Sequence, residues 1–229
     1  MKDIHATVLV NVKNKSEEEL FRNAEYTRRK NVKKAIREGL YIEETDSEKE
    51  YKNCYNLYSN ILNKGGSVPF SYLTWKKWAD EEKWKFFVIK LNRKSVGYFS
   101  IIPITKKFYG VESNEKGIRA RVFAYDKNYS DYRVNDFIYW NTILQGLKEG
   151  VDFVDLGGYQ IKPRGHLREV NKFKERWGGE IFYFYPNFPM HVAVVRKLIR
   201  NFGFMWWLNE KMKRFKITSD RIFLKQKID

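Results

Sequence analysis

The hydrophobic pattern at the start of the chain predicts a strand, a long helix and a second strand. Residues 7–12 alternate between β-branched and other side chains, as an extended strand does. Ser16 and Glu19 have the spacing of a capping box, which opens a helix. We expect this helix to continue without interruption to residue 38 and to be followed by a short strand over 40–44.

The middle of the chain changes from helical to extended periodicity. Apolar residues recur every three or four positions over 48–62, which predicts a second helix, and another helix is predicted over 69–82 after a turn. Residues 84–91 and 95–105 then form a predicted hairpin of antiparallel strands. A further extended segment is expected over 107–111.

The next part of the chain has the order strand, helix, strand. Residues 118–125 alternate, 132–149 form a predicted helix, and 151–156 form another strand. A crossover of this kind places its two strands parallel. A polar loop, a short helix and a strand over 181–185 follow, and helices are predicted over 190–200 and 205–215 with an extended end at 221–224.

These elements predict an α/β (α+β) fold with a mixed sheet, antiparallel early and parallel late, flanked by helices. The order is that of an acetyltransferase-like (GNAT-like) domain. The sequence has no low-complexity linker or internal repeat, so its 229 residues are predicted to form one domain. Residues 185–229 would be its basic, aromatic C-terminal helical extension.

The excess of basic over acidic residues indicates an anionic partner. The formal net charge is +16, and a field of that sign concentrates polyanions near the surface. Six basic residues fall between positions 28 and 37. Residues 190–229 hold ten basic and three acidic side chains mixed with aromatic ones, which suits peripheral contact with an anionic membrane or, alternatively, packing on the domain.

Several classes of site and location are disfavoured by the sequence. The single cysteine, Cys54, has apolar neighbours at helical spacing and reads as a packed hydrophobe. His5 and His191 have no partners at metal-ligand spacing, so no metal site is expected. The start of the chain lacks the layout of a signal peptide, and no apolar run reaches the roughly 18 residues of a membrane span. A cytoplasmic location, with contact at the inner membrane surface as an extension of it, is expected.

The loop before the helix at 132–149 bears on coenzyme A. Acetyltransferases place a glycine-bearing loop there to wrap the pyrophosphate. Residues 126–131 read DKNYSD, with two carboxylates and no glycine. An acyl-CoA donor is therefore the less favoured alternative, and no cofactor is expected.

Three stretches resemble the Fem-type (FemAB-like) aminoacyltransferases of peptidoglycan bridges. They are RRKNVKKAIREGLYIEE at 28–44, VDFVDLGG at 151–158 and NKFKERWGGE at 171–180. The resemblance covers most of residues 5–185 and is most specific in the third stretch. It implies an enzyme that joins the carboxyl group of an aminoacyl-tRNA to an amine of a peptidoglycan precursor, as part of cell wall biogenesis.

The resemblance assigns expected roles to individual residues. Lys174 would support the oxyanion of the transferring ester, and Phe173 would set the backbone that faces the amine. Asp155 would orient an amine or cap the following loop. Gly157 and Gly158 would leave room for substrate or form an ordinary bulge.

Further candidates would contact the substrates. Tyr159 and His166 belong to the loop between the two motif halves, where His166 is a candidate base or an exposed histidine. Without the resemblance, Lys174 would read as an ordinary surface lysine. The polyanionic ligand is expected at a basic group that comprises Arg28, Arg29, Lys33 and Lys34.

One departure from the family concerns size. Typical Fem transferases join two such domains, and this chain supplies about one. The acceptor could accordingly be a lipid-linked or nucleotide-linked muropeptide or another amine, and a partner subunit could replace the second domain. A non-catalytic adaptor that binds RNA or membrane is the alternative from outside the enzymes.

Overall fold

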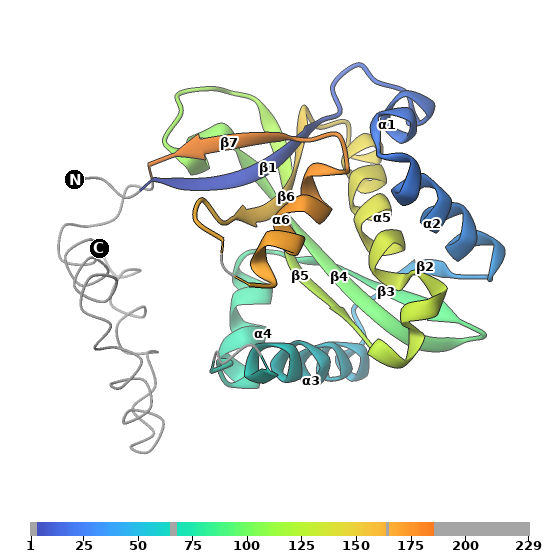
Figure 1. Cartoon of the computed structure of the whole chain (residues 1–229). Coiled ribbons are helices and arrows are strands. Elements are labelled where there is room, and N and C mark those ends of the chain that lie inside the picture. The colour runs from blue at the N-terminus through green and yellow to red at the C-terminus, as the bar shows by residue number, and fades with distance from the viewer. Residues whose placement is uncertain (1–3, 65–67, 164, 186–229) are drawn as a thin grey trace. The chain divides into compact units, whose positions relative to one another are not determined.

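The computed structural model describes residues 4–64, 68–163 and 165–185 (Figure 1). The helices predicted over 190–200 and 205–215 and the extended end at 221–224 lie outside these residues. In the described part of the chain, no helix combines the length and apolar character that crossing a membrane requires.

Seven strands form one mixed sheet in the order β2-β3-β4-β5-β6-β1-β7. The strands β5 and β6 run parallel, whereas all other neighbours in the sheet are antiparallel. The predicted fold class, a mixed sheet flanked by helices, is therefore confirmed. The strands are β1 His5–Asn11, β2 Tyr41–Glu44, β3 Lys85–Leu91, β4 Lys94–Thr105, β5 Lys116–Tyr125, β6 Phe153–Tyr159 and β7 Glu180–Phe184.

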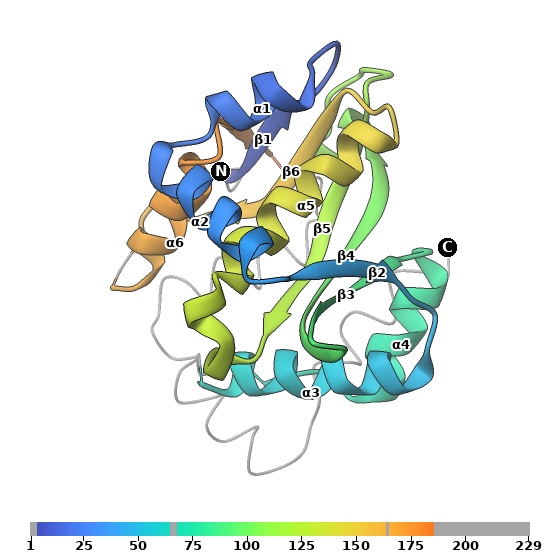
Figure 2. The same ribbon diagram turned by 90° about the vertical axis from the view of Figure 1, so that its right-hand side faces the viewer.

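Helices cover both faces of the sheet (Figures 1 and 2). Buried residues of α1, α2 and α5 share one apolar core with one face of the strands. Buried residues of α3 and α4 form a second core against the other face of β3, β4 and β5. The helices are α1 Glu17–Asn23, α2 Tyr26–Arg37, α3 Glu48–Lys64, α4 Tyr72–Glu81, α5 Val134–Lys148 and α6 Leu167–Glu175, with 3-10 turns η1 Lys106–Tyr109 and η2 Lys127–Tyr132.

The two parallel strands separate after a short paired stretch. Pairing between β5 and β6 covers Gly117 to Arg119 on one strand and Phe153 to Asp155 on the other. Beyond that point β5 continues to Tyr125 beside β4, and β6 continues beside β1. The last residue pair, Arg119 and Asp155, therefore marks a splay in the sheet.

The long helix predicted over 16–38 is two helices. The Ser16 capping box is present, but Ala24 is extended, with φ −69° and ψ 144°, and ends α1. The break is fixed by tertiary contacts, since the Glu25 amide donates to the Arg176 carbonyl at 2.8 Å and the two side chains form an ion pair at 2.9 Å. A distant segment thus overrides the local helical pattern.

Two other boundaries differ from the sequence prediction. Residues 106–109 form the 3-10 turn η1 in place of an extended segment, because Tyr109 turns inward and packs on the rings of Phe182 and Phe184. Strand β6 does not end at residue 156, since β1 pairs with it as far as Tyr159. Asp155 therefore lies inside the strand, and the two glycines that follow belong to the sheet.

Candidate functional site

Lys174 lies at the splay of the sheet with its side chain directed into the protein. It is 8% exposed, and its Nζ donates a hydrogen bond to the Gly158 carbonyl oxygen at 2.8 Å. Burial lowers the pKa of the Lys174 ammonium to about 8, the Asp155 carboxylate opposes this change, and Arg119 adds to it. The lysine is thus a poorly solvated cation near two other charged groups of the splay.

Gly157 lies beside this ammonium in a backbone conformation that favours glycine. Its φ is +89°, in the left-handed region that side chains rarely adopt, and an added Cβ would lie 3.4 Å from the Lys174 Nζ. An added Cβ at Gly158 would meet nothing within 4 Å. The positive φ of Gly157 therefore favours glycine at this turn of β6, while Gly158 supplies the carbonyl that accepts the Lys174 hydrogen bond.

Asp155 is a fully buried carboxylate held by several donors. Tyr109 donates its hydroxyl hydrogen at 2.6 Å, the Gly157 amide donates at 2.7 Å, and the Thr7 hydroxyl also donates. The guanidinium of Arg119 is 3.4 Å away. With 0% exposure, Asp155 acts as a fixed counter-charge for Lys174 and Arg119.

Phe173, the residue before Lys174, is fixed by contacts from two helices. Its ring lies edge-on to Tyr139 of α5 at 4.8 Å between centroids. The guanidinium carbon of Arg28 lies 4.8 Å from the centre of the same ring. The turn of α6 that carries Lys174 is therefore held against α2 and α5.

Arg28 is a buried residue of the core and does not line the basic surface. It is 8% exposed and bonds Asp136 at 2.7 Å, while Asn31 donates to the other carboxylate oxygen at 3.2 Å. Burial raises the pKa of Asp136 to about 6, although the Arg28 charge acts in the opposite direction. Arg28 thus lies away from the surface on which polyanion binding was predicted.

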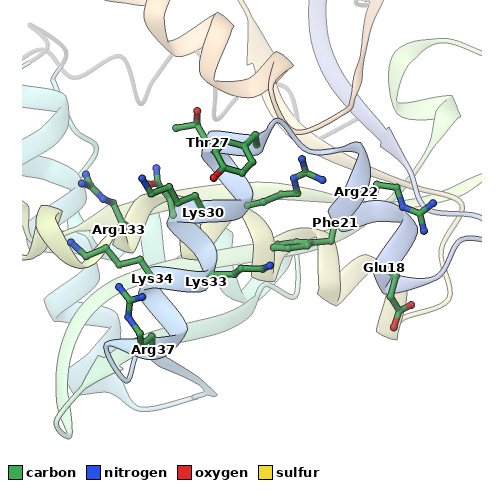
Figure 3. A pocket seen from close by; sticks show the side chains of 12 residues that line it. Glu18, Phe21, Arg22, Thr27, Lys30, Lys33, Lys34, Arg37 and Arg133 are labelled. Carbon is green, nitrogen blue, oxygen red and sulfur yellow. The ribbon is translucent and has the colours of Figure 1, made fainter.

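The other predicted basic residues, Arg29, Lys33 and Lys34, line a hollow of about 960 Å³ over α1, α2 and the start of α5 (Figure 3). We call this feature the basic hollow. Its seven cationic residues are Arg22, Arg29, Lys30, Lys33, Lys34, Arg37 and Arg133, and its lining also includes Glu18, Phe21, Tyr26, Thr27 and Asn31.

The Tyr159 hydroxyl is engaged by the residue that follows Lys174, and His166 lies about two turns before Lys174 along α6. The Tyr159 hydroxyl donates to Glu175 at 2.6 Å, and this hydrogen bond raises the pKa of Tyr159 to about 12. His166 is exposed just before the first residue of α6. Eight helical residues correspond to about 12 Å along the axis between His166 and Lys174. Their substrate roles remain predictions.

Backbone amides of the loop between β5 and α5 donate hydrogen bonds to acceptors within the same loop. Asn128 N donates to the Asp126 carboxylate at 3.0 Å, and Tyr129 N donates to the Asp126 carbonyl at 3.0 Å. Arg133 N donates to the Ser130 carbonyl at 2.9 Å. These amides are engaged within the turn η2 and do not form an open cradle for a pyrophosphate.

Sequence reasoning missed several residues of the site. Thr7, Tyr109 and Arg119 surround Asp155, but no local pattern marks them because they come from three separate elements. The burial of Arg28 had a signal, since Arg28, Val32 and Ala35 follow one another at helical spacing and all three are buried. Among residues 4–64, 68–163 and 165–185, no group of three or more His, Cys, Asp or Glu side chains could hold a metal ion.

Several solved structures have a fold similar to that of this chain. FemX matches with a TM-score of 0.64 and 12% identity, over 79% of this chain and 60% of FemX. The chain has the Fem-type fold. The structure of L-PGS from Bacillus licheniformis matches with a TM-score of 0.56 and 15% identity, over 87% of this chain and 65% of L-PGS.

A third structure extends the comparison. The C-terminal domain (DUF2156) of an Agrobacterium fabrum protein matches with a TM-score of 0.55 and 12% identity, over 86% of this chain and 65% of that one. The chain thus spans between three fifths and two thirds of the structures that share the Fem-type fold. No protein-family profile matches the sequence, and no curated protein matches it significantly. The resemblance to the Fem family is confirmed for the fold.

Proposed function

We propose that the chain is an acyltransferase that joins the carboxyl group of an aminoacyl-tRNA to an amine of a peptidoglycan-precursor-like acceptor. The observation that carries this proposal is the buried Lys174 ammonium at the splay of the sheet. Lys174 makes one hydrogen bond among the described residues, to Gly158 O, and an ammonium has three hydrogens to donate. Two donors therefore stay available for a substrate oxygen.

The charges around Lys174 suit a reaction that develops negative charge. Lys174, Arg119 and Asp155 together carry one net positive charge when the lysine is protonated. In a poorly solvated place this charge favours an oxyanion more strongly than it would in water. Such stabilisation accelerates a reaction because the oxyanion exists only near the transition state.

The proposed reaction proceeds without a covalent enzyme intermediate. The amine nitrogen attacks the ester carbonyl carbon, a C–N bond forms, and the carbonyl oxygen becomes negative beside Lys174. The carbonyl double bond then re-forms, the C–O bond to the ribose breaks, and the amine proton passes to the departing ribose oxygen. The products are an amide and a free tRNA 3′ end.

The turn between β5 and α5 supports an ester donor over acyl-CoA. Its amides are engaged with Asp126 and Ser130, and Asp126 brings a negative charge to the place where a pyrophosphate would bind. A thioester donor would lack the cradle that its diphosphate requires.

A donor and acceptor panel tests the proposal. The protein is incubated with charged tRNAs and, separately, with acyl-CoAs, each against nucleotide-linked muropeptides and simple amines, and products are identified by mass. We expect an amide product with an aminoacyl-tRNA donor. Products formed only from thioesters would refute aminoacyl-tRNA as the donor. If no product forms although the protein is fully active in the cell, a non-catalytic binding adaptor is favoured.

A further inference from the structure

The cations of the basic hollow form no ion pair with a carboxylate, whereas about half of the cations elsewhere in the described chain do. On α3, α4, the sheet and α6, lysines and arginines such as Lys52, Lys77 and Lys90 form ion pairs. Within the described residues, none of the seven cations of the basic hollow forms an ion pair, and its one acidic lining residue is Glu18. Arg22 and Arg133 act electrostatically on the Glu19 and Asp136 carboxylates without pairing with them. The described part of the protein therefore leaves most of the excess positive charge of the basic hollow without a partner.

The cations follow the length of two helices. Figure 3 shows Arg22 of α1 towards one end of the row and Arg37 of α2 towards the other, where Arg133, just before α5, also lies. From residue 29 to residue 37 alone, the helix rises about 12 Å. One phosphate group would contact a few of these side chains, whereas a strand of phosphates would contact the whole row.

An aromatic side chain accompanies the row. Tyr26 at the start of α2 is 70% exposed, and the Arg29 guanidinium lies 5.9 Å from the centre of its ring. Exposed aromatic rings beside cations serve as stacking platforms for the bases of single-stranded nucleic acid. In addition, the Nε of Arg133 is buried without a hydrogen-bond partner in the described chain.

We propose that the basic hollow binds RNA, with its cations on consecutive phosphates and a base stacked on Tyr26. A concave surface of about 960 Å³ fits a strand better than a flat bilayer does. The inference deepens the proposed function and rests on it, because an aminoacyl-tRNA donor is the RNA that would be bound. Arg28, on the inner face of the same helix, contacts Phe173, so α2 lies between the basic hollow and the turn that carries Lys174.

Two triple variants with equal net charge test the site. Arg29→Gln, Lys30→Gln and Lys33→Gln together remove three cations from the basic hollow. Lys52→Gln, Lys64→Gln and Lys77→Gln remove three exposed cations from α3 and α4. Binding of a labelled RNA hairpin with a single-stranded 3′ tail is measured by fluorescence anisotropy over a range of salt concentrations.

We expect the hollow variant to bind RNA at least roughly tenfold more weakly, and the control variant to bind within about twofold of the wild type. The slope of log affinity against log salt should become shallower by about 2 to 3 in the hollow variant, because each lost phosphate contact removes about 0.7 to 0.9. Tyr26→Ala should weaken binding at least about fivefold with an unchanged salt slope.

Equal losses in the two triple variants would overturn the inference, because net charge and not the site would then govern binding. It would also be overturned if the hollow variant lost binding to anionic lipid vesicles, or to a nucleotide diphosphate, while keeping its RNA affinity. RNA binding is measured without any transfer reaction. If the basic hollow binds RNA but no transfer occurs, the proposed transfer reaction is refuted and the RNA site is not. If tRNA-dependent transfer is unchanged in the hollow variant, the RNA site is refuted and the transfer reaction is not.

Discussion

Replacing Arg28 by methionine keeps most of the side-chain length but removes the charge from a buried ion pair. Arg28 bonds Asp136 at 2.7 Å and lies 4.8 Å from the Phe173 ring centre. Removing one partner of a buried pair costs about 3–5 kcal/mol, because the other charge is left uncompensated. The lost ring contact adds about 1 kcal/mol. We expect the free energy of unfolding at pH 7.5 to fall by about 4–6 kcal/mol.

The loss of stability in Arg28→Met should become smaller as the pH falls. The pKa of Asp136 is already raised to about 6 in the folded protein from 3.8, and the Arg28 charge restrains that rise. Without Arg28 the folded pKa rises further, so the folded state takes up a proton more readily than the unfolded state. A carboxyl group with a raised folded pKa gains stability as pH falls. The difference between Arg28→Met and the wild type should therefore shrink from pH 7.5 towards pH 5.

Urea denaturation followed by tryptophan fluorescence measures these changes. The double variant Arg28→Met with Asp136→Leu should recover most of the loss, because an apolar pair can replace a buried ion pair. Arg176→Met, which breaks the half-exposed pair with Glu25, is the control and should cost no more than about 1 kcal/mol. A loss below about 1 kcal/mol in Arg28→Met, or a further loss in the double variant, would refute the reasoning.

Two other predictions concern the surroundings of Lys174. Transfer should decline as pH rises through about 8, where the lysine loses its proton, and Asp155→Asn should move this decline to lower pH because Asp155 raises the Lys174 pKa; a pH–rate profile with no such displacement would contradict this. Gly157→Ala should lower the free energy of unfolding by about 1 kcal/mol or more and slow transfer, whereas Gly158→Ala should change stability by less than about 0.5 kcal/mol. Equal effects of the two alanines, in denaturation and in transfer assays, would count against the role of Gly157.

Much of the fold could be predicted from local patterns. The hairpin of β3 and β4 and the crossover from β5 through α5 to β6 follow from hydrophobic period and from glycines that end helices. Errors arose where distant segments decide the local structure. The break between α1 and α2 depends on Arg176, and the inward turn of Tyr109 depends on Asp155 and on the aromatic residues of β7. In each case the contacting residues lie too far apart in the sequence for a local pattern to include both of them.

The site, like the fold, could be predicted only in part, because contacts between distant segments decide which side chains are buried. Lys174 was identified through a family motif, and its burial comes from the packing of α6 against the splay. Four neighbouring cations in the sequence looked alike, yet Arg28 lies on the buried stripe of α2 while Arg29, Lys33 and Lys34 line the basic hollow. Residue type gave the charge of each side chain, and only its position around the helix separated the two roles.

The rate of amide formation by Lys174 variants tests the central claim most directly. Single-turnover transfer from an aminoacyl-tRNA to the acceptor found in the donor and acceptor panel is followed by mass, together with RNA affinity and thermal stability. We predict that Lys174→Ala lowers the transfer rate by about 10²–10³ while RNA affinity stays within about twofold, because one oxyanion donor is lost. Lys174→Arg should retain part of the rate. A folded Lys174→Ala protein that transfers at the wild-type rate would contradict the account.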